Sequence, residues 1–265
     1  MKTIAICNLK GGVAKTTTAV NLAATFAREH KKRVLLTDAD SQANSTAFLR
    51  RDDDGNRRTL AGLLRIPELQ RTEFTASVEF LQTVRPSAFP GVALLPADVS
   101  LMDLDLSKAE DKRAWTTVLR LGLAGPQDWD FVLIDFPPAF NAASAAALLA
   151  ADEVLIPVKL DAFALEGMAN LLQQIANMRR INPRLTILGV LPVMWYRSDV
   201  IIKAESALRN AGLPVLPRIR RSDLVDAMTF SQRPLLVCSP KCGPCRDYKL
   251  LAKQLLLPEG GETDG

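Results

Sequence analysis

The sequence contains no long apolar run, which excludes one class of protein from the start. None of its 265 residues falls in a stretch of about 18 consecutive apolar residues, the length that a transmembrane helix needs. The apolar segment at the N-terminus, residues 2–7, is followed by glycines rather than by a longer apolar core. This pattern does not fit a secretory signal peptide, so we expect a cytoplasmic protein.

Cysteine is scarce, with four residues, and no internal repeat or long linker divides the chain. Few cysteines without a secretory signal fit a reducing compartment. With 48% hydrophobic residues, a chain of this length can bury one sizeable core. We expect a single domain over residues 1–257 and a disordered tail over residues 258–265 (PEGGETDG).

Short apolar runs alternate with helical patterns along the chain. The runs are continuous rather than alternating in polarity, which predicts an α/β fold with a doubly wound, mostly parallel sheet covered by helices on both faces. Residues 50–89 show no regular pattern, and their charged run reads as a loop. Predicted strands are 2–7, 33–40, 91–98, 129–138, 153–158, 185–193 and 213–219, and predicted helices are 15–29, 112–123, 144–151, 163–181, 200–211 and 247–256.

Positive charge is concentrated in the C-terminal third. Residues 179–253 hold 14 Lys and Arg against 5 Asp and Glu, although the net charge of the whole chain is only +4. Such an imbalance favours a surface that faces a polyanion. It is equally typical of a solvated surface without a partner, so charge alone leaves both interpretations open.

Residues 8–18 (NLKGGVAKTTT) join the first predicted strand to the first helix. Glycines in such a turn let backbone N–H groups face phosphate oxygens, and the helix N-terminus adds partial positive charge. Lys15 would reach the β- and γ-phosphates and the Thr16 hydroxyl would bind Mg²⁺. The usual spacing, G-x-x-x-x-G-K-[ST], fails at Leu9 and Ala14, whereas Lys-Gly-Gly-x-x-Lys-Thr fits.

That second pattern resembles the deviant Walker A motif of the ParA/MinD family of ATPases. The resemblance implies that Lys15 binds its own nucleotide and that Lys10 reaches the nucleotide of a partner chain, in a dimer that sandwiches two ATP molecules. Ala14 stands where the family most often has Gly, and we expect a helix entrance to tolerate its Cβ. The implied nucleotide-binding residues are Lys10, Gly11, Gly12, Val13, Ala14, Lys15, Thr16 and Thr17.

Carboxylates follow two of the predicted strands, Asp38 and Asp40 after one and Asp135 after another. Ligands of open α/β sheets bind beyond these strand ends, and carboxylates there suit Mg²⁺. Residues 34–44 (VLLTDADSQAN) resemble the first switch segment of the family, with Ser41 in place of proline, and residues 133–138 (LIDFPP) resemble its Walker B motif and second switch. By these resemblances Asp40 orients or activates the attacking water, Asp38 supports the Mg²⁺ shell, and Asp135 contacts a Mg²⁺-bound water.

Residues 216–234 (LPRIRRSDLVDAMTFSQRP) resemble the segment of ParA proteins that binds DNA without sequence preference. The resemblance places Pro217 and Arg218 at the adenine pocket. Arg220 and Arg221 are the first candidates for phosphate contacts, followed by Arg233, Lys203 and Lys249. The aromatic residues of this third are too scattered to indicate base stacking.

The last segment of the chain contains Cys238, Cys242 and Cys245. The sequence CGPC before a helix looks like the active site of thioredoxin, but the surrounding pattern does not. Three cysteines could also contribute to a metal or iron–sulfur site, although zinc normally takes four ligands. Free thiols in a surface loop, a metal site and a redox switch all remain open.

The resemblance as a whole implies a slow, partner-stimulated ATPase that uses ATP and Mg²⁺. It would form a homodimer on ATP, bind double-stranded DNA nonspecifically over the nucleoid, and release it when a ParB-like adaptor stimulates hydrolysis. The cargo would be a plasmid, a chromosome or a large assembly. Alternatives are an iron–sulfur carrier of the Mrp type and a membrane-associated regulator of the MinD type, the latter disfavoured by the acidic, glycine-rich end of the chain.

Overall fold

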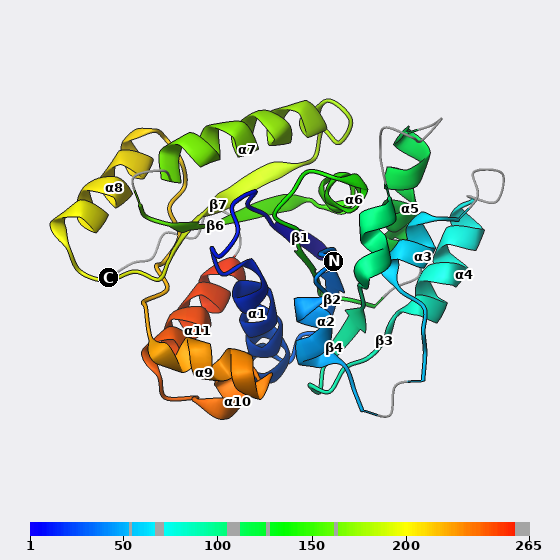
Figure 1. Ribbon diagram of the computed structural model, residues 1–265, viewed down its shortest axis with the longest axis horizontal. Helices are drawn as coiled ribbons and strands as arrows, with labels where there is room; N and C mark the ends of the chain where they lie inside the picture. Colours follow the sequence, from blue (N-terminus) through cyan, green and yellow to red (C-terminus); the bar gives the residue numbers. More distant parts are fainter. Residues whose placement is uncertain (53–54, 67–71, 105–111, 126–127, 162–163, 258–265) are drawn as a thin grey trace.

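A seven-stranded sheet forms the centre of the molecule (Figure 1). The computed structural model describes residues 1–52, 55–66, 72–104, 112–125, 128–161 and 164–257. The strand order is β3-β4-β2-β5-β1-β6-β7, and only β3 runs antiparallel to its neighbour, β4. The strands are β1 (Lys2–Ile6), β2 (Val34–Asp38), β3 (Arg85–Pro86), β4 (Val92–Leu95), β5 (Phe131–Asp135), β6 (Glu153–Lys159) and β7 (Thr186–Val193).

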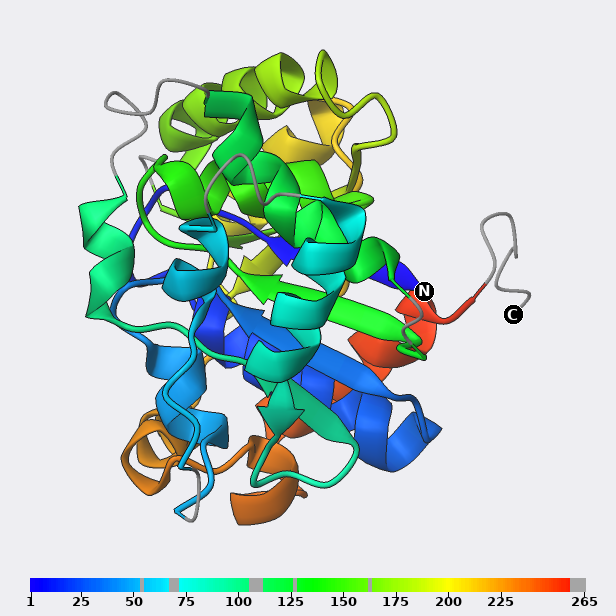
Figure 2. The same cartoon turned by 90° about the vertical axis from the view of Figure 1, so that its right-hand side faces the viewer.

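Helices cover both faces of this sheet, as Figures 1 and 2 show. The central strands are buried on both sides, which explains why their sequences are continuously apolar. The helices are α1 (Lys15–His30), α2 (Asn44–Leu49), α3 (Leu60–Leu64), α4 (Glu73–Thr83), η2 (Val99–Asp103), α5 (Lys112–Ala124), α6 (Ala142–Ala150), α7 (Ala164–Arg179), α8 (Asp199–Asn210), α9 (Asp223–Ser231), α10 (Leu235–Cys238) and α11 (Gly243–Leu255).

Two hydrophobic clusters divide the core, one on each face of the sheet. Successive side chains of a strand point to opposite faces, so Ile4 belongs to one cluster and Ala5 to the other. Helices α3 to α8 pack over the face of Ala5. Helices α1, α2, α9, α10 and α11 pack over the face of Ile4.

The register of the parallel strands brings their carboxyl ends together. Ile6 at the end of β1 pairs with Asp135 at the end of β5, and Asp135 in turn pairs with Asp38 at the end of β2. The loop that follows β1 therefore lies at the same edge of the sheet as two acidic residues. This edge is where open α/β sheets bind ligands.

The predicted fold class is correct, and six of the seven predicted strands are present. Residues 213–219 are the exception, because their backbone hydrogen bonds to β7 and Trp195 form only isolated bridges at Val215 and Arg220 among the described residues and no strand. Pro214 and Pro217 have no backbone N–H and cannot donate a hydrogen bond to a neighbouring strand, which explains why no strand forms there. Residues 50–89, predicted as irregular, contain α3, α4 and β3.

Three helices near the C-terminus also differ from the prediction, among them α10, which was not predicted. Helix α11 begins at Gly243 rather than at residue 247, because Cys242 caps it and Pro244 occupies its first turn. Helix α9 was not predicted, although Ser222 and Asp223 supply an ordinary N-terminal signal. The predicted tail, residues 258–265, lies outside the described residues.

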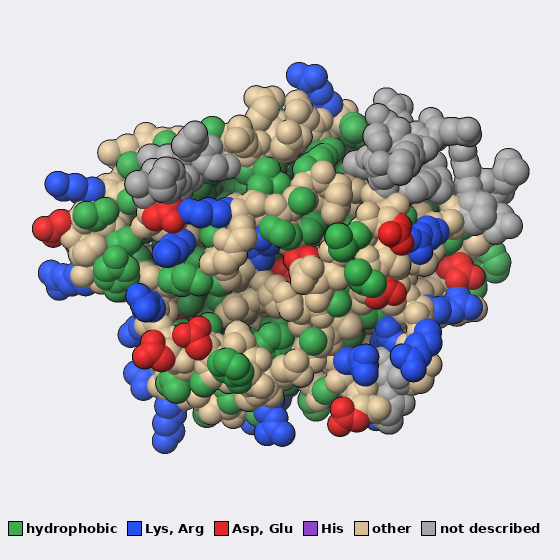
Figure 3. Space-filling view, in the orientation of Figure 1, with side chains coloured by type: hydrophobic (Ala, Val, Ile, Leu, Met, Phe, Trp, Pro, Cys, Tyr) green, Lys and Arg blue, Asp and Glu red, His purple; other side chains and the backbone are tan. Residues whose placement is uncertain are grey.

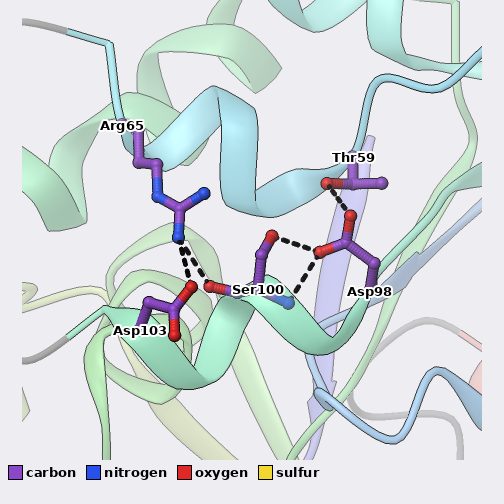
Figure 4. A network of polar contacts seen from close by, with 5 residues as sticks. All are labelled: Thr59, Arg65, Asp98, Ser100 and Asp103. Carbon is purple, nitrogen blue, oxygen red and sulfur yellow. Dashed lines mark hydrogen bonds and ion pairs between the residues drawn. The ribbon is translucent and has the colours of Figure 1, made fainter.

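Short polar contacts fix η2 against α3 (Figure 4). Asp98 caps η2 by accepting a hydrogen bond from the Ser100 backbone at 3.0 Å, and it also accepts one from the Thr59 hydroxyl at 3.1 Å. Arg65 at the end of α3 donates to the Ser100 carbonyl and to Asp103. These bonds order a region whose sequence gave no regular pattern.

Within the described part of the chain, the helices are all too short or too polar to cross a membrane.

Candidate nucleotide-binding site

The loop of residues 7–14 leaves β1 and turns into α1 at the carboxyl edge of the sheet. Asn8 holds its first half, since its side chain accepts from the Lys10 amide at 2.9 Å and donates to the Pro157 carbonyl at 2.7 Å. Gly12 has a φ of 69°, a left-handed conformation that favours glycine. A Cβ at Gly11 or Gly12 would meet no atom within 4 Å, so both face open space.

Ala14 is also left-handed, with φ 57° and ψ 32°, and it immediately precedes α1. We expected a backbone region that tolerates a Cβ, and this one admits it only with strain. The glycine that the family most often has at this position would adopt the conformation freely. The expectation for Ala14 therefore needs correction: the residue is accommodated at a cost.

Lys15 begins α1 and is 8% exposed, with its ammonium directed back across the loop. Nζ donates to the Lys10 carbonyl at 3.0 Å. Burial lowers the pKa of Lys15, whereas the nearby carboxylates Asp135 and Asp40 act in the opposite direction. A buried cation beside an open space of this kind suits an anionic ligand.

Asp38 and Asp135 are fully or almost fully buried at neighbouring strand ends. Asp38 accepts hydrogen bonds from the backbone and hydroxyl of Thr46, both at 2.8 Å, and from the Asp40 amide at 3.1 Å. Burial and repulsion from Asp135 raise the pKa of Asp38 to about 7. Both oxygens of Asp38 thus already have protein donors, so its contact with a metal would be indirect.

Asp135 differs from Asp38 in one respect that concerns metal binding. Its Oδ2 accepts from the Ser45 hydroxyl at 2.7 Å, but its Oδ1 is buried without a hydrogen-bond partner among the described residues. Burial raises the pKa of Asp135 to about 6, while the hydroxyls of Ser45 and Thr16 lower it. A buried carboxylate oxygen with a free lone pair beside a threonine hydroxyl is a suitable donor set for Mg²⁺.

Asp40 lies at the mouth of the site and is 9% exposed. Its Oδ1 accepts from the Gln42 amide at 3.0 Å, which fixes the carboxylate in a short turn. Asp40 and Gln42 both line the cavity described next, whereas Asp38 does not. The three predicted carboxylates therefore lie at the same edge of the sheet, but only Asp40 lines the cavity.

A cavity of about 680 Å³ opens above these groups. This volume is ample for a nucleotide-sized ligand. One wall is the loop and the start of α1, and the opposite wall is the segment that enters α9. Its lining residues include Gly11, Gly12, Val13, Ala14, Lys15, Thr16, Thr17, Asp40, Gln42, Asn44, Met194, Tyr196, Ile219, Arg220, Arg221, Ser222, Asp223, Val225, Asp226, Thr229 and Tyr248.

Pro217 and Arg218 lie outside this cavity. They line a second one of about 730 Å³, together with Trp195, Glu205 and others. The Arg218 guanidinium stacks over the Trp195 ring at 3.6 Å from its centroid. Their predicted contact with adenine is therefore not supported by the lining of the first cavity. The wall of that cavity opposite the loop is formed by residues between Ile219 and Asp226 instead.

Lys10 is held within its own chain. Its ammonium lies 2.7 Å from Oδ2 of Asp161, just beyond the end of β6, and both side chains are partly exposed. Asp161 was not among the site residues predicted from the sequence. The position of β6 beside β1 is the signal that could have found it, because the carboxyl ends of neighbouring parallel strands meet.

The predicted basic residues fall into two groups. Arg220 donates to the Asp247 carboxylate at 2.8 and 2.6 Å, and Lys249 pairs with Glu29 at 3.1 Å. Arg221, Arg233 and Lys203 are exposed, and none of the ion pairs found among the described residues includes them. Figure 3 shows Lys and Arg side chains along the left and lower edges of this face, with acidic residues between them.

The cysteines are all free thiols. Cys7 is buried on the sheet, Cys238 is exposed, and Cys242 and Cys245 lie together at the start of α11. No group of three or more His, Cys, Asp or Glu residues within the described ranges is arranged to hold a metal ion.

Comparison with known proteins places this geometry in context. A family model described as an AAA domain matches residues 1–187. The chain is 32% identical to the chromosome partitioning protein ParA of Caulobacter vibrioides, over 98% of this chain and 95% of the relative. It is 34% identical to the chromosome-partitioning ATPase Soj of Thermus thermophilus, over 97% and 96%.

A solved structure agrees with these matches. Cobyrinic acid a,c-diamide synthase from Mycobacterium smegmatis, with a bound ATP analogue and magnesium, superposes with a TM-score of 0.76 at 28% identity. The match covers 97% of this chain and 94% of that one. The similarity therefore extends over the sheet, the loop and the helices around the cavity.

Proposed function

Because this chain belongs to the ParA/MinD-type family of ATPases, we propose that it is a partition or positioning ATPase that binds ATP with Mg²⁺ and hydrolyses it at the cavity beside Lys15. The observation that carries this proposal is that a buried lysine, a glycine loop and Asp40 line one cavity, at the sheet edge where Asp38 and Asp135 are buried. No covalent intermediate on a Glu, Lys or Cys side chain is required, since hydrolysis of a phosphoanhydride depends on positioning the reactants and neutralising the charge of the phosphates.

Phosphate binding follows from the loop and the start of α1. The amides of residues 11–16 and the helix N-terminus supply donors and partial positive charge. Lys15 exchanges its bond to the Lys10 carbonyl for a charge-assisted bond to a phosphate oxygen. Since its ammonium is already buried and fixed, little reorganisation is needed on binding.

Mg²⁺ fits the residues that are present. Asp135 offers a buried Oδ1 without a partner, and Thr16 offers its hydroxyl. Bound there, Mg²⁺ would neutralise charge on the phosphates. Asp38, whose oxygens accept from Thr46 and Asp40, would keep the segment of residues 40–46 in place around that shell.

Asp40 is the group best placed to orient the attacking water. It lines the cavity, and its Oδ1 is fixed by the Gln42 amide. Replacing Asp40 by Ala would therefore slow hydrolysis more than nucleotide binding. ATP would then remain bound for longer.

The role of Lys10 requires a second chain. Its ammonium is partly exposed, and Lys10 is not among the residues that line the cavity. A long, flexible side chain with a compact charge can reach a nucleotide held by a partner chain. We therefore propose that ATP promotes a homodimer in which each Lys10 leaves Asp161 and contacts the partner's nucleotide.

DNA binding is assigned to the basic C-terminal third. Arg221 and Arg220 border the cavity, so their position can depend on the nucleotide. Exposed Arg233 and Lys203 and the partly exposed Lys249 supply further charge for phosphate contacts without sequence preference. A ParB-like adaptor would then stimulate hydrolysis and release the dimer from the nucleoid.

The decisive experiment is binding to a DNA duplex of arbitrary sequence, with ATP·Mg²⁺ and with ADP·Mg²⁺, at low and moderate salt. We expect tight binding with ATP only, weakened by salt as counterion release requires. Arg221→Ala should weaken it, and Arg184→Ala, which removes an exposed arginine after α7, serves as the matched control. Equal binding in both nucleotide states, or none, would refute the proposed DNA-bound state while leaving the ATPase assignment to be judged by phosphate release.

A further inference from the structure

Two cysteines occupy the first turn of α11 in a specific arrangement. Cys242 is the N-cap, and its sulfur accepts a hydrogen bond from the Cys245 amide, three residues into the helix, at 3.3 Å. Gly243 and Pro244 separate them, and proline is well suited to this turn because it needs no hydrogen-bond donor there. The two side chains thus share one helical turn, with the Cys242 sulfur already turned toward Cys245.

The two thiols differ in access, which gives them distinct roles. Cys242 is partly exposed, whereas Cys245 is 2% exposed. A reagent in solution would meet Cys242 first, and Cys245 would react only with a group attached to Cys242. Cys238 is exposed at the end of α10, where its thiol donates to the Arg233 carbonyl at 3.5 Å. It is the natural comparison for a thiol that is merely accessible.

The same turn holds an arginine of the nucleotide cavity. A Cβ on Gly243 would lie 2.5 Å from Cδ of Arg220, so the arginine stem packs directly on the backbone between the two cysteines. Asp247, one turn further along α11, binds the Arg220 guanidinium and also accepts from its amide at 2.9 Å. Any change in the backbone of residues 242–247 is therefore transmitted to Arg220, which lines both cavities.

We propose that Cys242 and Cys245 form a reversible dithiol–disulfide site that exchanges with small aliphatic disulfides, and that its oxidation state alters the hold of α11 on Arg220. The Cys242 thiolate attacks one sulfur of the oxidant, forming a mixed disulfide and releasing one thiol. Cys245, after losing its proton to solvent, then attacks the Cys242 sulfur and releases the second thiol. The protein loses two electrons and two protons, and the small disulfide becomes two thiols.

The surroundings of Cys242 and Cys245 determine the protonation state of the two thiols. Burial raises the pKa of both thiols, while the Cys245 amide lowers that of Cys242 and Lys249 lowers that of Cys245. Both groups are accordingly thiols at neutral pH, and exchange is slower than at an activated cysteine. The pair should therefore respond slowly to a change in the disulfide pool.

The first experiment locates the disulfide. The full-length protein is equilibrated anaerobically at graded ratios of oxidised to reduced glutathione, alkylated and digested with trypsin. Cleavage after Lys241 and Arg246 gives a peptide, residues 242–246, that contains only this pair, and Cys238 falls in the preceding peptide. We expect peptide 242–246 to lose both alkylation sites and about 2 Da, the two hydrogens of the disulfide, as the ratio rises.

Matched variants make this result decisive. Cys242→Ser keeps a good N-cap and removes the thiol, so peptide 242–246 should then alkylate at Cys245 at every ratio. Cys238→Ser should leave the titration unchanged. Full alkylation of peptide 242–246 at all ratios, or oxidation that involves Cys238 instead, would overturn the proposal.

The second experiment tests the link to Arg220. The affinity for a fluorescent ATP analogue is measured for the oxidised and reduced protein, and again for Cys242→Ser under both conditions. We expect a several-fold difference for the natural sequence and none for the variant. A disulfide that forms without changing the affinity would remove the coupling to Arg220, and it would do so independently of whether the protein binds DNA.

Discussion

The ammonium of Lys10 and the carboxylate of Asp161 form an ion pair of 2.7 Å between the loop after β1 and the segment after β6. The proposed function needs the same ammonium at the nucleotide of a second chain. Both contacts cannot be made at once. The pair with Asp161 therefore competes with dimer formation. A stronger pair would raise the dissociation constant of the ATP-dependent dimer.

Asp161→Asn is expected to strengthen ATP-dependent dimerisation. The two side chains are 40% and 30% exposed, so one pair is worth at most about 1 kcal/mol. A homodimer would lose two such pairs, at most about 2 kcal/mol, which corresponds to a change of up to about 30-fold in the dimer dissociation constant. Sedimentation with a non-hydrolysable ATP analogue measures this constant. Asp199→Asn, on α8, is the control. Weaker association of the Asp161 variant would show that Asp161 supports the dimer rather than opposing it.

Lys15→Ala is expected to abolish nucleotide binding, because it removes the only buried ammonium at the cavity among the residues that the structure describes. Lys10→Ala should instead spare binding by one chain and impair dimerisation and hydrolysis. Calorimetry with an ATP analogue, combined with phosphate release, separates the two effects. Lys253→Ala, an exposed lysine of α11, should change neither. Similar losses of affinity in the Lys10 and Lys15 variants would contradict the division of roles.

The sequence predicted the sheet and the loop because their signals are local. Continuous apolar runs followed by glycine or aspartate identify strands and their carboxyl ends, and Asp38, Asp40 and Asp135 do meet there. The contacts of Asp161 with Lys10 and of Asp247 with Arg220 could not be predicted in this way, because residues 151 and 27 positions apart meet only through the order of strands and the packing of α11. The left-handed conformation of Ala14 could not be predicted either, because the identity of a residue does not determine its backbone angles.

The buried carboxyl groups of Asp38 and Asp135 predict that the free energy of unfolding falls as the pH rises. Burial raises the pKa of Asp38 to about 7 and that of Asp135 to about 6, both from 3.8. Between pH 3.8 and about 7 the folded protein binds more protons than the unfolded chain. This contribution to stability is therefore complete below pH 3.8 and is lost progressively as the pH rises to about 7. Without Mg²⁺, the free energy of unfolding should therefore carry the full destabilising contribution from this pair at about pH 8, and this contribution should be absent only below a pH of about 3.8.

Asp135→Asn isolates that contribution. Its side chain can still accept from Ser45, and the loss of one charge also relieves the repulsion that raises the pKa of Asp38. Urea unfolding of both proteins in a chelating buffer should show that the variant gains stability relative to the natural sequence as the pH rises. The variant should lose any stabilisation by Mg²⁺ with nucleotide. Parallel pH profiles for the two proteins would mean that the carboxyls are not coupled as described.

Ala14→Gly should stabilise the chain, although glycine usually weakens a helix. At φ 57° an L-residue carries strain of about 1–2 kcal/mol, whereas the extra freedom of glycine in the unfolded chain costs about 0.4–1 kcal/mol. The net gain of about 0.5 kcal/mol should raise the midpoint of guanidinium unfolding. Ala43→Gly is the matched control, because Ala43 has φ 53° before α2 and lies outside the phosphate loop. Both variants should gain stability, but only Ala14→Gly should change nucleotide affinity, since only Ala14 lines the cavity. A loss of stability in both would show that the strain is smaller than the entropy that glycine costs, and the alanine would then be the better residue at this helix entrance.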